Sequence, residues 1–403
     1  MVELLRGSAS KSRSETPTDA PLRGRRVCCV VQTGTPARNA RLIKVAEAAS
    51  AAGADTTILY VSHSGDCAEP QGPFEVRQVA TRPPSQHRVW LLRVVTNLWR
   101  ELVINPRLVT SAAARERADV YHAHFLPMLR PAHRAARRNR AALVYDVRDL
   151  FLDAGYSSVP LWRQRYLGRI ERRLIHKAQA VLAVGRPMAD VLEERYGLTN
   201  VQVLLNGPYR CSSEATPISS PVRLLFQGAF RRNRNLTNLV RAMDSLRGDA
   251  ELTLQGWGDQ EGELRALVDS LGLQGTVHFR EPCEPRDVVT CAQEYDVGVI
   301  CYRADTLNLK ISTPNKLFDY IGAGLAVAAS DLPGLRSVVG PTGCGVLIDP
   351  TSAETLAAGL REIVSDSTRL LSMKQASVDA CDSLSWDRQA EKLVAIYAES
   401  LRG

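Results

Sequence analysis

Short apolar runs alternate with helical patterns along most of the chain. In the first half, residues 27–32 predict a buried strand, the Ala-rich stretch 39–52 a helix that ends at Gly53, and residues 56–61 a second strand. Four further apolar runs in this half have the length and bounding residues of strands: 120–123, 142–146, 180–184 and 201–205.

The second half shows the same alternation of strand and helix patterns after Asn206-Gly207-Pro208. Helices are predicted at 235–246 and 260–271, and strands at 222–227, 251–255, 276–280, 295–302, 326–329 and 346–348. Strands that alternate with helices of ten to fifteen residues indicate parallel sheets covered on both faces. The pattern therefore predicts an α/β protein of two Rossmann-like domains facing a central cleft, with ligands bound at the carboxyl ends of the strands.

These elements divide the chain into four parts. Residues 1–24 are rich in Ser, Thr, Arg and Pro, without the apolar core of a secretory signal, and predict a disordered tail. Residues 25–208 form the first domain and 209–385 the second. The closing segment 386–403 predicts a helix that packs back on the first domain.

The charge is unevenly divided between the two halves. The chain of 403 residues has a net charge of +8, but residues 1–208 carry 31 basic and 18 acidic side chains, whereas 209–403 carry 20 and 25. An excess of positive charge suits nucleic acid, an anionic membrane surface or an acidic small molecule. Only 6% of residues are aromatic and no base-stacking motif occurs, which argues against nucleic acid.

Two compositional features bear on compartment and membrane. No run approaches eighteen uncharged apolar residues, so no spanning helix is predicted. The nine cysteines include no C-x-x-C pair, and several lie in apolar runs, so we expect reduced, buried thiols and a cytoplasmic protein without structural zinc.

The segment 309–329, LKISTPNKLFDYIGAGLAVAA, has the features of an anion-binding helix start. Thr313 suits the N-cap and Pro314 the first helical position, after Ser312. The free amides of Asn315 and Lys316, the helix dipole and the lysine charge would then bind a diphosphate.

Asp319 follows four residues after Asn315, on the same face and about 6 Å further along the axis, which is roughly the step from a diphosphate to a ribose. A capped surface helix with a solvated aspartate fits the local pattern equally well.

The chain resembles a known family through several motifs in order. NKLFDYIGAGLAVAASDLPGL resembles the donor-site signature of family-4 type glycosyltransferases of the GT-B fold, and ADVYHAHFLPML, LVYDVRDLF and LLFQGAFRRNRNLTNLVRAM are similar to other segments of that family. The resemblance implies transfer of a sugar from a UDP- or GDP-sugar to an acceptor saccharide, lipid-linked saccharide or small molecule. It also implies retention of anomeric configuration, with no metal or cofactor and the leaving diphosphate accepting the acceptor's proton.

The resemblance assigns roles to residues of the second domain. Asp319 stands where the family's second acid binds the donor ribose, whereas Ile311 replaces the first acid eight residues earlier. After Gly228, Ala229 replaces a phosphate-binding arginine; Arg234 matches the family's second cation, and Arg231 could supply the missing charge. Arg234 and Lys316 are thus the expected catalytic cations, with Gly256 and Pro282 on the donor-binding loops. An exposed basic loop at 228–234 and a simple tight turn at Gly256 are the structural alternatives.

In the first domain the resemblance places Gly34 against the donor diphosphate, and Arg148 where the family usually has an active-site histidine. Arginine does not shuttle protons near neutral pH, so Arg148 is expected to bind sugar or phosphate. His122 and His124 are assigned to the acceptor side. Their H-x-H spacing suits a metal, but no third ligand is evident and no D-x-D pair occurs, so no metal site is predicted.

Residues 88–105 predict an amphipathic helix ended by Asn105-Pro106, with Leu98 on the apolar face and Arg100 opposite. Its accompanying Trp90 and Trp99 leave two interpretations open, core packing and peripheral contact with anionic lipid at the inner membrane face.

Two functions other than sugar transfer also stay open for the protein: a sugar-nucleotide 2-epimerase and a non-catalytic nucleotide-sugar-binding protein.

Overall fold

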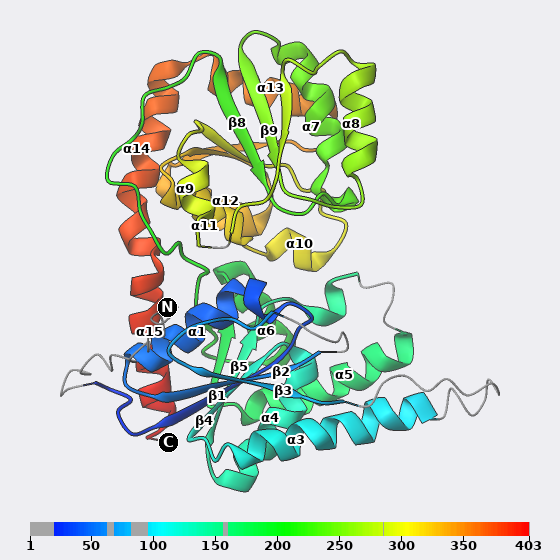
Figure 1. Ribbon diagram of the computed structural model, residues 1–403, viewed down its shortest axis with the longest axis vertical. Coiled ribbons are helices and arrows are strands. Elements are labelled where there is room, and N and C mark those ends of the chain that lie inside the picture. Colours follow the sequence, from blue (N-terminus) through cyan, green and yellow to red (C-terminus); the bar gives the residue numbers. More distant parts are fainter. Residues whose placement is uncertain (1–19, 63–67, 82–95, 156–159, 285, 403) are drawn as a thin grey trace, which may run out of the picture.

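The computed structural model describes residues 20–62, 68–81, 96–155, 160–284 and 286–402. The described chain forms two α/β domains stacked one above the other (Figure 1). Both sheets are entirely parallel, as the alternation of strands and helices predicted.

The first domain contains a seven-stranded sheet in the order β3-β2-β1-β4-β5-β6-β7. Its strands are β1 (Arg26–Gln32), β2 (Asp55–Val61), β3 (Glu75–Val79), β4 (Val120–His124), β5 (Ala142–Val147), β6 (Ala180–Ala183) and β7 (Gln202–Val203). Its helices are α1 (Ala40–Ala51), α3 (Asn105–Arg115), α4 (Leu126–Asn139), α5 (Leu161–Leu174) and α6 (Arg186–Tyr196). The sequence missed β3, because this edge strand is mostly exposed and has no apolar run.

The second domain contains a six-stranded sheet in the order β10-β9-β8-β11-β12-β13. Its strands are β8 (Val222–Gln227), β9 (Ala250–Gln255), β10 (Val277–Arg280), β11 (Val297–Ile300), β12 (Ala326–Ser330) and β13 (Gly345–Ile348). Its helices are α7 (Leu236–Ala242), α8 (Glu261–Ser270), α9 (Val288–Ala292), α10 (Leu307–Ile311), α11 (Asn315–Gly322), α12 (Pro333–Thr342), α13 (Ala353–Val364) and α14 (Ser367–Leu384).

Alternate residues of each central strand enter different cores. In β1, Cys28 and Val30 pack with α3 and α4, whereas Cys29 and Val31 pack with α1 and the last helix, α15 (Trp386–Ser400). Both faces of the sheet are therefore buried, which explains the continuous apolar run of β1 from Val27 to Val31.

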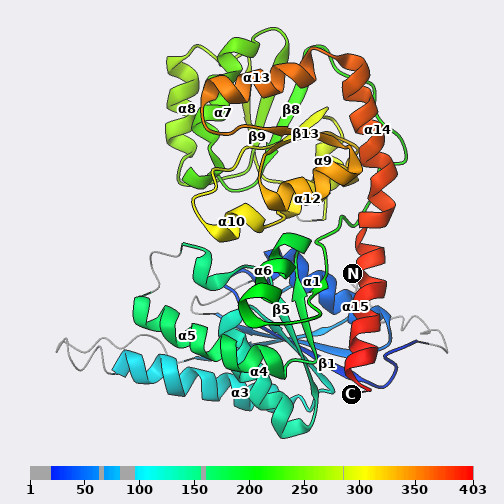
Figure 2. The ribbon, with the colours of Figure 1, turned by 180° about the vertical axis from the view of Figure 1, so that it is seen from behind.

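Helices α14 and α15 run along one side of the molecule, so that α14 covers the second domain and α15 lies on the first (Figures 1 and 2). Tyr397 of α15 is fully buried in the first domain. Where the chain crosses between domains, the Trp386 amide donates to the Pro208 carbonyl at 2.9 Å, and a Cβ on Gly207 would lie 2.0 Å from the Leu384 carbonyl oxygen. Only glycine permits this close crossing.

Two sequence predictions about the course of the chain are wrong in detail. Residues 20–24, assigned to a disordered tail, belong to the first domain, because Leu22 is fully buried and its amide donates to the Ala52 carbonyl. Asn105-Pro106 does not end the preceding helix. A π-helix, η2 (Arg100–Ile104), widens the turn and leads into α3, with Pro106 in its first turn, where a missing N–H is tolerated.

The burial of side chains around this π-helix also differs from the prediction. Arg100 is buried and Leu98 exposed, the reverse of the prediction. Trp90 and residues 82–95 lie outside the described residues.

The expectation of reduced thiols is also wrong for four cysteines. Cys211 is bonded to Cys381, and Cys283 to Cys291. The first bridge joins the interdomain linker to α14 across a separation of 170 residues, a pairing that sequence spacing does not reveal. Cys28, Cys29, Cys301 and Cys344 are free and buried, and Cys67 lies outside the described residues.

Candidate functional site

A cavity of about 410 Å³ lies between the domains, at the carboxyl ends of the second domain's strands and opposite α1. Seven of the residues assigned to the donor from sequence line it: Gly228, Arg234, Gly256, Pro282, Asn315, Lys316 and Asp319. They come from four different loops and helices, which the parallel sheet brings to one edge.

Arg234 and Lys316 form a cationic wall backed by aromatic rings. The Arg234 guanidinium lies 4.2 Å from the ring centre of Tyr302, and the Lys316 ammonium lies 3.5 Å from that of Phe226. Neither cation forms an ion pair within the part of the chain that the structure describes. Burial and the neighbouring Arg234 lower the pKa of Lys316 well below its usual range. An anion placed between Arg234 and Lys316 would favour the protonated form of the lysine and would then be stabilised by both charges.

Asp319 lies one turn along α11 from Lys316 and lines the same cavity. Burial raises its pKa to about 6, although Lys44 and Lys316 oppose the shift. The carboxylate is thus charged near neutral pH and is available to accept hydrogen bonds from a ligand's hydroxyls.

The start of α11 differs from the sequence prediction. Pro314 takes the N-cap position itself, and the Thr313 hydroxyl donates instead to the Val184 carbonyl of the first domain at 2.5 Å. Ser312 ends α10 and, like Thr313, does not line the cavity. Thr313, assigned to donor binding, therefore lies at the contact between the domains, and Ser312 lies outside the cavity lining. Asn315, Lys316 and Asp319 of α11 do line the cavity.

The glycine loops after β8 and β9 touch each other at the cavity floor. Gly256 has φ of +151°, and a Cβ there would lie 2.0 Å from the Gly228 carbonyl oxygen. Only glycine fits at position 256, because the two loops pack backbone against backbone there.

The wall contributed by the first domain and the linker was not found from the sequence. It is formed by Arg38, Ala40, Lys44, Tyr209 and Arg210. Arg38 lies 5.4 Å from the ring centre of Trp257, and Arg286 pairs with Glu47 at 3.6 Å, so both contacts join the two domains. The sequence predicted only an Ala-rich helix at this place, and the folded chain shows which of its residues face the cavity.

Three other assigned residues lie outside the cavity lining. Arg231 lines a neighbouring groove with Arg232 and Asp305, and Gly34 is exposed on the loop after β1. Arg148 donates to the Asn39 side chain at 2.7 Å and stacks on Phe125, and burial lowers its pKa to about 10.

The departure at Ile311 has a structural role in this chain. Ile311 is 4% exposed and packs into the core of the first domain, so the position of the family's first acid is occupied by an interdomain apolar contact. Asn308, three residues earlier on α10, accepts a hydrogen bond from the Leu150 amide and donates one to the Asp149 carboxylate.

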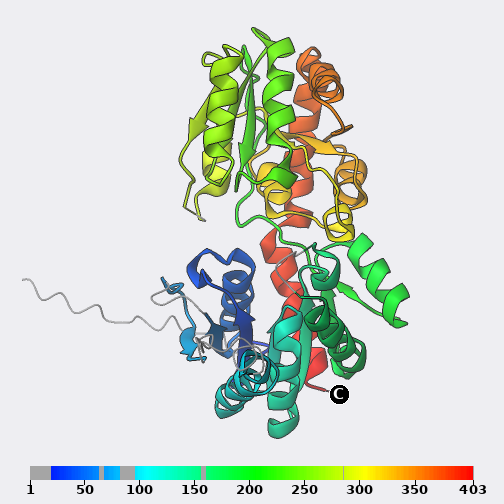
Figure 3. The same cartoon turned by 90° about the vertical axis from the view of Figure 1, so that its right-hand side faces the viewer.

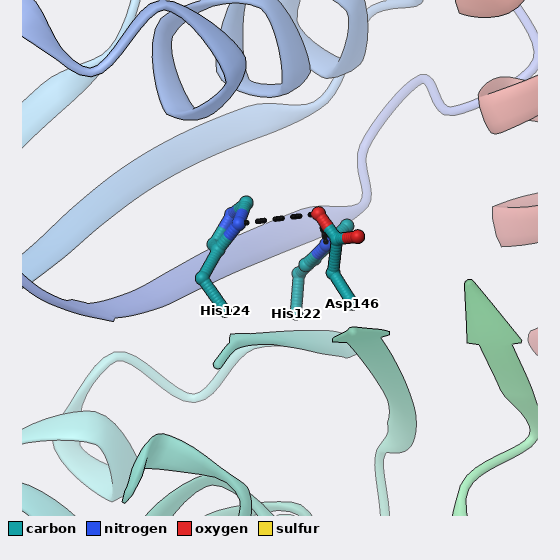
Figure 4. Close-up of side chains that lie close together, drawn as sticks. All are labelled: His122, His124 and Asp146. Atoms are coloured by element: carbon teal, nitrogen blue, oxygen red, sulfur yellow. Dashed lines mark ion pairs between the residues drawn. The ribbon is translucent and has the colours of Figure 1, made fainter. Parts of the chain in front are cut away.

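His122 and His124 lie inside the first domain, not on an acceptor surface, because both side chains are fully buried. Both lie close to Asp146, at 3.5 and 3.4 Å (Figure 4). Asp146 is thus the third group that the sequence did not reveal. However, Arg41 holds both oxygens of this carboxylate at 2.7 and 2.8 Å, and the imidazole rings are stacked 4.3 Å apart. Stacked rings do not direct their nitrogen lone pairs at a common ion, and Arg41 already neutralises the carboxylate, so the geometry opposes a metal.

Burial lowers the pKa of His124 to about 3, which keeps its imidazole neutral. The His122 ring is held by the Tyr397 hydroxyl at 2.6 Å from Nδ1, and so joins β4 to α15. The cluster therefore connects the closing helix to the sheet.

Among the described residues, no helix is long and apolar enough to cross a membrane.

Two α/β domains with a cationic cavity at the carboxyl ends of their strands define the class of GT-B transferases. The glycosyl transferase 4-like domain matches residues 39–208, and the glycosyl transferases group 1 domain matches residues 213–378. The two matches cover both domains in the expected order, and the chain belongs to the group 1 glycosyltransferases.

Individual relatives are distant. D-inositol 3-phosphate glycosyltransferase of Corynebacterium aurimucosum is 27% identical over 135 residues, which are 34% of this chain and 31% of the relative. The chain spans 31% to 65% of the length of three curated relatives that it matches.

Solved structures share the fold over nearly the whole chain. Sucrose-phosphate synthase from Thermosynechococcus elongatus has a TM-score of 0.70 at 17% identity, covering 93% of this chain and 98% of its own. HepE of Anabaena, in complex with UDP-glucose, has a TM-score of 0.66 at 15% identity and covers 92% and 98%.

Proposed function

We propose that the protein transfers a sugar from a nucleoside-diphosphate sugar to an acceptor, with retention of configuration and without a metal ion. The observation that carries the proposal is the pair Arg234 and Lys316, two cavity cations with no acidic partner among the described residues. A diphosphate is the ligand that best matches two such cations lining one cavity. The complex of the Anabaena relative with UDP-glucose supports a donor of this class.

The proposed mechanism uses the charge of the cavity. As the bond from the sugar to the diphosphate breaks, negative charge grows on the leaving oxygens, and Arg234 and Lys316 stabilise that charge more strongly than they stabilise the bound donor. The same oxygens then accept the acceptor's proton, so no protein base is required. An epimerase would need acid and base side chains, whereas the described lining includes no histidine and only Asp319 and Glu284 as acids.

The donor is testable with a panel of UDP- and GDP-sugars. One of them should raise the melting temperature of the protein, because a ligand that binds only the folded state stabilises it.

Asp319→Ala should lose about tenfold in affinity for that donor, the value of one to two charge-assisted hydrogen bonds. Since the pKa of Asp319 is raised to about 6, wild-type affinity should fall as the pH drops through that value. Equal stabilisation of Asp319→Ala and wild type would contradict the ribose assignment.

We also propose peripheral contact with anionic lipid through the first domain. Trp99 before α3 and Trp162 on α5 are 57% and 41% exposed, and the ion pair between Arg163 and Glu101 at 3.3 Å joins the two segments. Helices α3, α4 and α5 lie side by side in this region (Figure 2). Exposed arginines accompany the tryptophans: Arg107, Arg165, Arg169, Arg172 and Arg173. Aromatic side chains beside arginines suit an interfacial surface, and a lipid-linked acceptor would be presented there.

Vesicles containing anionic lipid should therefore bind the protein at low ionic strength. Replacing Trp99 and Trp162 together by serine should weaken binding by about tenfold, because both lose partial burial in the interface. Leu371→Ser, an exposed apolar residue of α14, is the control and should not change binding. Absence of wild-type binding in a vesicle co-sedimentation assay would contradict the membrane proposal.

A further inference from the structure

Lys44 of α1 lies where the first domain, the interdomain linker and the closing helix meet. Its ammonium donates to the Gly207 carbonyl at 2.6 Å and lies 4.4 Å from the ring centre of Tyr209 and 5.7 Å from that of Trp386. The side chain is 5% exposed and lines the cavity between the domains. A buried charge of this kind is costly unless polar partners surround it.

The Lys44 ammonium can donate more hydrogen bonds than it makes among the described residues. It carries three N–H groups, and within the described chain it makes one hydrogen bond, to Gly207. Asp319 lines the same cavity and interacts with Lys44 electrostatically, yet the two form no direct ion pair among the described residues. A hydroxylated ligand between them would donate to the carboxylate and accept from the ammonium.

Burial shifts the pKa values of both Lys44 and Asp319. Burial lowers the pKa of Lys44 to about 8, with Arg41 adding to the shift and Asp319 and Glu47 opposing it. Burial raises the pKa of Asp319, and Lys44 opposes that shift. Each group therefore stabilises the charged form of the other, but this attraction does not fully offset the effect of burial on either pKa.

We propose that Lys44 is a donor-positioning residue that binds the ribose of the nucleotide together with Asp319. The inference rests on the proposed function. In this arrangement the ammonium donates to a ribose hydroxyl oxygen, and Asp319 accepts the ribose hydroxyl protons. Because Lys44 belongs to the first domain and is held at the Gly207 crossing, the ribose is bound by both domains only when they are closed.

The test is titration calorimetry of the full chain with UDP and GDP, and with the 2′,3′-dideoxy counterpart of the tighter one. Lys44→Met keeps the length and apolar stem, and should weaken binding of the tighter nucleotide by about tenfold. It should bind the dideoxy counterpart as wild type does, because that ligand lacks the hydroxyls Lys44 contacts. Lys177→Met, an exposed lysine remote from the cavity lining, is the matched control and should bind every ligand as wild type does.

A second measurement does not depend on the methionine variant folding. Wild-type affinity should fall as the pH rises through about 8, where Lys44 loses its charge, and Lys44→Arg should show a shallower fall because arginine stays protonated.

The outcomes separate the two proposals. No binding of UDP or GDP to wild type overturns the proposed function and this inference with it. Unchanged nucleotide affinity in Lys44→Met, or an equal loss for the dideoxy ligand, overturns the role of Lys44 at the ribose and leaves the proposed function standing. Identical pH profiles for wild type and Lys44→Arg would overturn it as well.

Discussion

Replacing Arg234 by alanine should lower kcat/KM for donor cleavage by about 1000-fold, and Lys316→Ala should have an effect of similar size. The reason is that each cation stabilises charge that develops as the diphosphate leaves, inside a cavity where burial strengthens electrostatic interactions. Since the effect belongs to the transition state, kcat should fall along with kcat/KM. Steady-state release of nucleoside diphosphate measures both constants.

Arg232→Ala is the matched control for Arg234. It lies two residues earlier in the same short 3-10 helix, but its side chain is exposed and paired with Glu263 at 3.1 Å. Its removal should change kcat/KM by less than about twofold. Equal losses in the two variants would show that the loop, and not the cation facing the cavity, is responsible.

Replacing Arg41 by methionine should lower the free energy of unfolding by about 3–5 kcal/mol, because it leaves the buried carboxylate of Asp146 without its partner. Arg41 also donates to the Leu204 carbonyl and the Asn206 side chain, so it holds the end of the first domain at the crossing. Chemical denaturation of wild type and variant measures the difference.

The Asp146 carboxylate should make the free energy of unfolding decrease at acid pH. Burial alone would raise the pKa of Asp146, but Arg41 and the two histidines hold it well below its usual range. This stabilisation is present above the ordinary aspartate pKa of about 4 and is lost as the pH falls below it.

The control for Arg41→Met is Arg25→Met, which removes an exposed ion pair with Asp119 in the same domain and should cost no more than about 1 kcal/mol. If both variants lose the same small amount, the buried network does not stabilise the domain as argued.

The sequence predicted the sheets well because their central strands are buried on both faces. Residues 222–227 were predicted as a strand and form β8 with those bounds. The apolar run of such a strand is continuous, and glycine or proline ends it. The edge strand β3 and the path through Asn105-Pro106 were missed, because a polar edge strand and a π-helix have no comparable pattern.

The candidate site was predictable where one loop or one helix carries it. Lys316 and Asp319 share α11, and Arg234 lies in the short 3-10 helix η5 (Arg232–Arg234) that follows β8, so each position could be assigned from one local motif. Lys44 and Arg38 face the same cavity from another domain, and Asp146 reaches the histidines from the neighbouring strand. Such long-range contacts depend on how the domains and strands meet, which local spacing does not encode.

The central claim is that the cavity cleaves a nucleoside-diphosphate sugar with its own cations. The most direct test measures nucleoside diphosphate released from the stabilising donor in the presence of EDTA, with wild type and Arg234→Ala compared at equal concentration. The account predicts steady release by wild type and about 1000-fold slower release by the variant. Binding without release, release that stops when EDTA is added, or equal release by both proteins would contradict it.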